Sequence, residues 1–139
     1  MSAIYITVQV KVAQPIEVVW QAFTSSEHIV NWNAESEDWH TLAASNDLQV
    51  GGTFVYTFAT RDGSVSLDFC GTYERILAYE HISYVIEDGR RVTIDFRQEV
   101  DGVMVIEKFE PGTVHNKELQ QAGWQAVLDR FKIYVENSL

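Results

Sequence analysis

The stretch Asn116–Leu139, NKELQQAGWQAVLDRFKIYVENSL, decides the fold. Large apolar residues recur in it at helical spacing and fall on one face: Trp124, Leu128, Phe131 and Val135. Polar residues that can stay in water fall on another face: Gln125, Asp129, Lys132 and Glu136. A helix of about 20 residues is about 30 Å long and is held mainly by the apolar surface on which it lies. Because most of the preceding chain has the pattern of strands, we expect this helix to lie on a sheet.

Gly123 lies inside this helix, where glycine costs about 1 kcal/mol relative to alanine. That cost is explained if the helix backbone approaches the sheet closely at this point. We further expect the helix and a curved sheet to leave a cavity between them. A small guest molecule would occupy that space.

The chain before the helix predicts about seven strands, most of them by alternation of apolar and polar residues. Their expected ranges are Ile4–Val12, Thr41–Val50, Thr53–Thr60, Val65–Ala78, His81–Glu87, a strand through Val92, Ile94 and Phe96, and Val103–Phe109. Turn signals such as Asp88-Gly89 and Asp101-Gly102 separate neighbouring strands and favour antiparallel pairing.

Two short helices are expected after the first strand. One begins at Pro15 and ends near Thr24, and the second covers about Glu27 to Trp32. A polar, acidic segment without a clean period follows and predicts a loop over Asn33–Trp39. Together the elements predict an α+β fold, in which a curved antiparallel sheet is covered on one face by the long helix.

Composition limits the class of protein. A chain of 139 residues, 46% hydrophobic and 12% aromatic, is expected to form a single domain over residues 1–139. No apolar run approaches the roughly 20 residues of a membrane span. The N-terminus, Met1 to Ile4, shows no basic leader, and the single cysteine, Cys70, suits a reducing compartment, so a cytoplasmic location is expected. A net charge of -10 is expected to repel nucleic acid and anionic lipid.

Several short motifs in this order resemble a known superfamily. They are Pro15-x-x-x-x-Trp20-x-x-Phe23, Gly51-Gly52-x-Phe54, Gly71-x-Tyr73 and Gly123-Trp124-x-x-x-Leu128. With the order of strand, two short helices, six strands and long helix, they resemble the SRPBCC superfamily, whose START-like fold is the helix grip. Within it the chain looks most like bacterial proteins similar to the activator of heat-shock protein 90 ATPase. Three further short motifs are similar to a pattern in one bacterial subgroup of those proteins. They are Trp32-Asn33-Ala34, Asp38-Trp39-His40 and Asn46-Asp47-Leu48.

The resemblance implies a deep pocket between the sheet and the long C-terminal helix. Elsewhere in the superfamily such pockets hold lipids, sterols, plant hormones and polyketides, so a binding protein for an apolar or amphipathic small molecule is the first hypothesis. An enzyme resembling the polyketide aromatase/cyclases is the second, and a chaperone-associated interaction protein is the third. The eukaryotic co-chaperone carries a separate N-terminal domain that a chain of this length is not expected to contain. We expect a monomer or a weak homodimer.

The residues expected to line the pocket come from the inward strand faces, the long helix and the loop. They are Trp32, Trp39, His40, Phe54, Tyr56, Phe58, Phe69, Tyr73, Tyr84, Ile94, Phe96, Glu107, Phe109, Trp124 and Leu128. Such an aromatic set forms either a packed core or the wall of an open pocket, and the sequence leaves both readings open. The loop from Trp32 to His40 would act as a lid, with Trp39 and His40 at the mouth.

Glu107 is the most informative single residue. It has the same strand parity as Val105 and Phe109, so it faces inward if they do. An unpartnered buried carboxylate costs several kcal/mol, so an inward Glu107 would be paired, protonated or hydrated. In the alternative, the strand buries Ile106 and leaves Glu107 in solvent. If the protein is an enzyme, the candidate acid and base groups are Glu107, Tyr56 and Tyr84.

Metal and nucleophile chemistry have no support in the sequence. Zinc ligands need close spacing, which is absent among His28, His40, His81 and His115, so no metal is expected. No G-x-S-x-G motif occurs, and Cys70 has no basic neighbour that would lower its pKa. No phosphate-binding loop is present, so no cofactor is expected.

Overall fold

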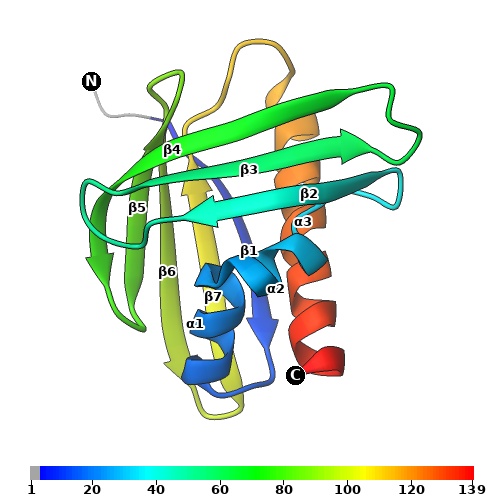
Figure 1. The fold of residues 1–139 in the computed structure, drawn as a ribbon. Helices are drawn as coiled ribbons and strands as arrows, with labels where there is room; N and C mark the ends of the chain where they lie inside the picture. The colour runs from blue at the N-terminus through cyan, green and yellow to red at the C-terminus, as the bar shows by residue number, and fades with distance from the viewer. Residues whose placement is uncertain (1–3) are drawn as a thin grey trace.

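A seven-stranded antiparallel sheet forms the frame of the computed structural model, which describes residues 4–139 (Figure 1). Its spatial order is β1-β7-β6-β5-β4-β3-β2. The strands are β1 (Ile6–Val12), β2 (Trp39–Asn46), β3 (Thr53–Thr60), β4 (Ser66–Leu77), β5 (His81–Ile86), β6 (Arg91–Glu99) and β7 (Gly102–Phe109). Every neighbouring pair is antiparallel. The predicted α+β fold with its antiparallel sheet is confirmed.

The sheet is curved, and two irregularities in its register help to bend it. β4 is its longest strand, with 12 residues, and the register shifts between Tyr73 and Arg75. A second shift lies in β2, between Thr41 and Ala43. Bulges of this kind bend a strand and increase its twist. As a result β2, β3 and β4 cross β6 and β7 at a steep angle in Figure 1.

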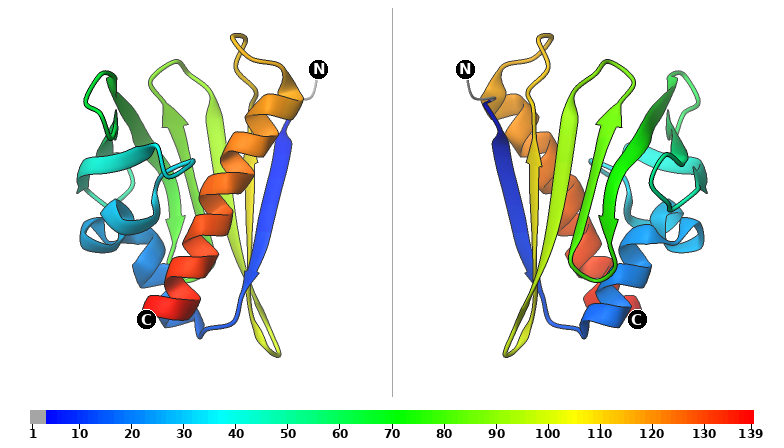
Figure 2. Two further views of the ribbon diagram at one scale, coloured as in Figure 1. Left: turned by 90° about the vertical axis from the view of Figure 1, so that its right-hand side faces the viewer. Right: turned by 90° about the vertical axis from the view of Figure 1, so that its left-hand side faces the viewer.

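Three helices lie on the concave side: α1 (Ile16–Thr24), α2 (Ser26–Trp32) and α3 (Lys117–Ser138). The cap of α3 is Asn116, whose side-chain oxygen accepts a hydrogen bond from the Leu119 amide at 2.7 Å. Figure 2 shows α3 running across the sheet, with α1 and α2 beside its C-terminal half. Among residues 4–139, no helix has both the length and the apolar character needed to cross a membrane.

The apolar face of α3 lies at the centre of the core. Leu128, Phe131 and Val135 are at most 1% exposed, and half-buried Trp124 continues the row toward the start of the helix. The Phe131 ring contacts the indole of Trp32 from α2, with ring centroids 4.8 Å apart. The helix face predicted from the spacing is therefore confirmed.

The polar face of α3 has a role beyond contact with water. β1 is an edge strand of the sheet, and two α3 side chains, Gln125 and Lys132, hydrogen-bond its open backbone edge, while Glu136 accepts from the amide of Ala13 just after it. The Gln125 amide nitrogen donates to the Gln9 carbonyl at 3.0 Å, and Lys132 Nζ donates to the Lys11 carbonyl at 2.6 Å. These bonds cover backbone groups that an edge strand otherwise offers to another chain.

Two strands differ from their sequence-based ranges by more than one residue at an end. β1 begins at Ile6 rather than at Ile4. β2 spans Trp39–Asn46 rather than Thr41–Val50, so the loop before it is shorter than expected. The expectation that the N-terminus shows no basic leader rested partly on residues 1–3. These residues lie outside the part of the chain that the structure describes.

The early end of β2 has a local cause. After Asn46 the chain turns, because the Gly52 amide donates to the Gln49 carbonyl at 2.8 Å. Gly51 has a φ of 83°, a left-handed conformation that favours glycine. These turn interactions replace the strand pairing that Leu48 and Val50 had suggested.

Candidate functional site

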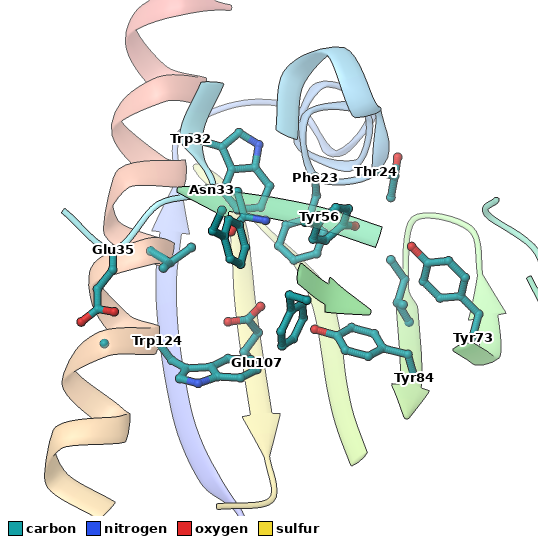
Figure 3. Close-up of a pocket in the computed structure, with 15 residues that line it drawn as sticks. Phe23, Thr24, Trp32, Asn33, Glu35, Tyr56, Tyr73, Tyr84, Glu107 and Trp124 are labelled. Atoms are coloured by element: carbon teal, nitrogen blue, oxygen red, sulfur yellow. The ribbon is translucent and has the colours of Figure 1, made fainter. Parts of the chain in front are cut away.

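A cavity of about 230 Å³ lies between the concave side of the sheet, α3 and the chain that follows α2 (Figure 3). Its lining residues are Phe23, Thr24, Trp32, Asn33, Glu35, Tyr56, Phe58, Phe69, Tyr73, Ile82, Tyr84, Glu107, Gly123, Trp124 and Val127. A water molecule takes up about 30 Å³ in the liquid, and an engineered cavity of about 150 Å³ holds benzene. The side chains of the sheet and of α3 therefore leave room for an organic molecule.

One wall of the cavity is aromatic. Alternation along β3 points Tyr56 and Phe58 to the concave side, and Phe69 of β4 lies opposite Tyr56 in the register. The rings of Tyr56 and Phe69 are stacked, with centroids 6.5 Å apart and an interplanar angle of 19°. Phe54 has the same parity but lies deeper, 1% exposed, because Gly71 opposite it leaves room for its ring.

Three tyrosine hydroxyl groups differ in their partners. The Tyr73 hydroxyl donates to Asn46 Oδ1 at 2.6 Å, and burial raises the pKa of Tyr73 to about 12. Burial also raises the pKa of Tyr56, whose hydroxyl interacts with that of Tyr73. No hydrogen bond reaches the Tyr84 hydroxyl from residues 4–139; burial, and then the nearby charge of Glu107, raises the pKa of Tyr84.

Glu107 points into the cavity from β7 (Figure 3). It is surrounded by apolar residues at most 1% exposed, its strand neighbours Val105 and Phe109 and its cross-strand partners Val8 and Ile94. Glu107 itself is 9% exposed, and within the described chain no hydrogen bond or ion pair reaches its carboxyl. Burial raises its pKa to about 8. The inward orientation expected from strand parity is confirmed, and the carboxyl is free to meet a guest.

Trp124 forms the α3 side of the cavity, and its indole lies over the ring of Phe109. Its neighbour Gly123 was expected to approach the sheet, which is wrong. A Cβ at Gly123 would lie 3.3 Å from Glu35 Oε1, so the close neighbour is the loop after α2. The small residue leaves room for that loop to pass over the helix.

Residues 33–38, called the lid loop below, cover one side of the cavity. Asn33 and Glu35 contribute to its lining. The Glu37 carboxylate pairs with Arg130 of α3 at 2.9 Å, and the Glu37 carbonyl accepts a hydrogen bond from Arg61 Nε at 2.6 Å. The hydrogen bond from Arg130 lowers the pKa of Glu37. The lid loop is thus fastened to α3 and to the chain that follows β3.

Many of the site residues named from the sequence meet in the cavity wall: Trp32, Tyr56, Phe58, Phe69, Tyr73, Tyr84, Glu107 and Trp124. Others are core residues beneath the wall, each at most 5% exposed: Phe54, Ile94, Phe96, Phe109 and Leu128. They face inward, as their periodicity predicts, but other side chains separate them from the cavity.

Trp39 and His40, expected at the mouth, do not line the cavity. They belong to β2, which begins earlier than the sequence suggested, and they pair there with Thr60 and Ala59 of β3. Pairing in an edge strand replaces the lid position expected for them.

Sequence reasoning missed part of the lining: Phe23, Thr24, Asn33, Glu35, Ile82 and Val127. Two of these carried a usable signal, since Ile82 shares the parity of Tyr84 and Val127 follows Trp124 by about one helical turn. Asn33 and Glu35, in the lid loop, carried no such sequence signal, because a loop has no periodicity that shows which side chains face inward.

Titratable side chains outside the cavity make structural contacts. Within residues 4–139, no three or more His, Cys, Asp or Glu side chains come together as a metal site would require. His28 Nδ1 contacts the Tyr134 hydroxyl at 2.7 Å, and His81 Nδ1 contacts an Asp95 carboxylate oxygen at 2.7 Å. Burial raises the pKa of Cys70, so its thiol is not activated as a nucleophile.

Known proteins resemble this chain both in sequence and in structure. The family model described as activator of Hsp90 ATPase homolog 1-like protein matches residues 13–136. An AHSA1-like protein from Aeromonas hydrophila is 44% identical over 96% of this chain and 92% of that chain, with a TM-score of 0.91. A protein from Cytophaga hutchinsonii is also 44% identical, over 97% of this chain and 92% of that chain, with a TM-score of 0.80. No curated protein matches the chain.

The fold extends to more distant proteins. A protein from Chromobacterium violaceum is 22% identical over 96% of this chain and 98% of that chain, with a TM-score of 0.86. The sheet gripped by a long C-terminal helix is the SRPBCC arrangement that the motifs resembled. The family match covers most of the chain, and the chain therefore belongs to the activator of Hsp90 ATPase homolog 1-like family.

Proposed function

We propose that this protein binds an apolar or amphipathic small molecule in the cavity between its sheet and α3, with residues 1–139 acting as one binding domain. The observation that carries the proposal is an aromatic cavity of about 230 Å³ into which an unpartnered buried carboxyl, Glu107, projects. Sites for small molecules are mostly apolar, with a few placed polar groups. A buried carboxyl without a partner and an open cavity both lower stability, so a guest accounts for them better than a plain core does.

The family and the lid loop support the proposal. The SRPBCC fold family commonly binds ligands. A guest also needs an entrance, and the lid loop carries exposed Glu35 beside the cavity. Its bond to α3 is an ion pair in which Glu37 is exposed, and water screens pairs of this kind, so they contribute little to stability. The ion pair is therefore the weaker of the two fastenings of the lid loop, beside the hydrogen bond from Arg61 to the Glu37 carbonyl.

Tryptophan fluorescence tests the proposal. Trp32 and Trp124 line the cavity, whereas Trp39 does not. Titration with lipids, sterols and small aromatic compounds is expected to change the emission for at least one class. The change should persist in Trp39→Phe and diminish in Trp124→Phe. An absence of any response, together with native mass spectra that show no bound compound in protein from its own host, would contradict the proposal.

Proton-transfer catalysis in the same cavity is a second candidate function, in the manner of the polyketide aromatase/cyclases. It is favoured by the Glu107 pKa of about 8, which leaves the carboxyl able to give or take a proton near neutral pH. Tyr84 lies close enough for Glu107 to raise its pKa, and Tyr56 lines the same wall. Turnover of an enolisable polyketide that disappears in Glu107→Gln while binding persists would favour the enzyme. Binding without turnover would favour the simple receptor.

A further inference from the structure

The cavity wall carries carboxyl groups and no basic side chain. Fifteen residues line it, and none of them is a lysine, an arginine or a histidine. Its carboxyl groups belong to Glu107, in the interior, and to Glu35, in the exposed lid loop. The chain as a whole has a net charge of -10. A carboxylate or phosphate guest would meet no basic side chain among these residues, whereas a cation would be attracted from solvent.

Glu107 is the polar group that a guest would need to satisfy. It is nine-tenths buried, and the groups beside it in the sheet are apolar. The titratable groups that share the cavity with it are the hydroxyls of Tyr56, Tyr73 and Tyr84 and the carboxyl of Glu35, and none of them supplies a positive charge. A cationic N–H donor placed here would form a charge-assisted hydrogen bond, which is about twice as strong as a neutral one.

Aromatic rings beside Glu107 suit the same kind of guest. Figure 3 shows the Glu107 carboxyl in the cavity whose wall also carries the indole of Trp124 and the phenol of Tyr84. The Phe69 ring is oriented edge to face with Trp124, with centroids 6.3 Å apart. Aromatic faces attract ammonium groups, and the attraction grows where water is displaced.

We infer that the cavity takes a protonated organic amine of about ten non-hydrogen atoms, with its ammonium group against Glu107 and its apolar body against the aromatic wall. The inference rests on the proposed binding function and names the chemical class of the guest. The size follows from the cavity volume of about 230 Å³, half as large again as the roughly 150 Å³ that holds benzene. Phe23, Trp32 and Phe58 supply apolar surface for the body of the amine.

Three compounds of one shape test the charge preference: 3-phenylpropylamine, 3-phenylpropan-1-ol and 3-phenylpropionate. Their affinities are measured by calorimetry and by tryptophan fluorescence at pH 8, where the amine is protonated. The amine should bind at least tenfold more tightly than the alcohol, and the carboxylate should bind most weakly. Tighter binding of the carboxylate or of the alcohol than of the amine would overturn the inference.

Two matched variants assign the preference to Glu107. Glu107→Gln should weaken amine binding at least tenfold and change alcohol binding less than threefold. Glu80→Gln removes the same charge from an exposed position between β4 and β5 and should change neither affinity. A cooperative thermal unfolding transition in each variant is the control that it is folded.

The outcomes separate this inference from the function on which it rests. Unchanged amine affinity in Glu107→Gln, or binding of the alcohol alone, would overturn the amine inference and leave small-molecule binding standing. If none of the three compounds and no member of the wider library binds, both the amine inference and the proposed function are overturned.

Discussion

The indole ring of Trp124 lies stacked on the ring of Phe109, with centroids 4.1 Å apart and an interplanar angle of 12°. Phe109 is fully buried, whereas Trp124 is half-buried and lines the cavity. The indole therefore covers Phe109 and separates it from the cavity. Because Phe109 and Glu107 lie on the same face of β7, we expect the indole also to limit the access of water to Glu107.

Replacement of Trp124 by alanine should open this part of the cavity. We expect a loss of about 2–4 kcal/mol in the free energy of unfolding, near the lower end of values for large aromatic residues because Trp124 is half-buried. Water that enters should also lower the pKa of Glu107 from about 8 toward its ordinary value of 4.5. Urea unfolding measures the first effect, and carbon-13 NMR of the glutamate carboxyls measures the second.

Trp124→Phe is the control for this prediction, since it keeps an aromatic ring over Phe109. It should cost less stability and leave the pKa of Glu107 high. An unchanged Glu107 pKa in Trp124→Ala would show that the indole does not exclude water from this carboxyl.

Glu107 should make stability fall with rising pH. Its folded-state pKa of about 8 lies above the ordinary 4.5, so the folded protein binds this proton more tightly than the unfolded chain does. The stabilisation is fully present below pH 4.5 and is lost as the pH rises through about 8. Because one pKa unit corresponds to about 1.4 kcal/mol, we expect a fall of about 2–4 kcal/mol between pH 5 and pH 8.5. Urea unfolding across this range measures it.

The Glu107→Gln variant separates the pH effect of Glu107 from the pH effects of the other carboxyl groups. Hydrogen bonds from the side chain and backbone of Ser64 hold the pKa of Asp62 at about 2, and Lys132 lowers the pKa of Glu136. Both groups contribute stability that is lost in acid, below pH 4.5, and so outside the window of Glu107. The variant should show a much smaller fall between pH 5 and pH 8.5. A fall as steep as that of the wild type would refute the assignment to Glu107.

Two glycines should respond in opposite ways to alanine. At Gly123 the added Cβ would meet the Glu35 carboxyl at 3.3 Å, the end of an exposed side chain that can rotate away. Helix propensity then favours alanine by about 1 kcal/mol, which should raise Tm by about 4 °C. At Gly71 the Cβ would lie 2.5 Å from ring atoms of buried Phe54, so Gly71→Ala should cost about 1–3 kcal/mol. Calorimetric unfolding compares the two, and equal effects would contradict the contacts described.

The ion pair between Glu37 and Arg130 should affect the motion of the lid loop more than it affects the overall stability of the protein. Glu37→Gln should leave the free energy of unfolding nearly unchanged, because the Glu37 side chain is exposed and its ion pair is screened by water. Amide hydrogen exchange over residues 34–38 should speed up several-fold, and so should entry and exit of 3-phenylpropylamine. Glu80→Gln serves as the charge-matched control. Exchange as slow as in the wild type would mean that the ion pair does not hold the lid loop.

Much of the fold was predictable because its signals are local. The spacing of Leu128, Phe131 and Val135 marks one helix face, and alternation marks Tyr56 and Phe58 as inward on their strand. The strand boundaries after Asn46 were missed, since hydrogen bonds within the turn at residues 47–52 outweigh the strand preference of its apolar residues. The use of Gln125, Lys132 and Glu136 to cover the edge of β1 was also missed, because it depends on which strand lies beside α3.

The sequence by itself determined the order of the elements, the antiparallel pairing and the inward parity of Glu107, because periodicity and turn residues act over a few positions of the chain. The tertiary structure alone decided which inward side chains reach the cavity. That selection depends on the bend of β4 at Tyr73, on the room that Gly71 leaves for Phe54, on the stacking of Trp124 over Phe109 and on the path of the lid loop. Each of these depends on how separate elements pack together, and no local pattern records it.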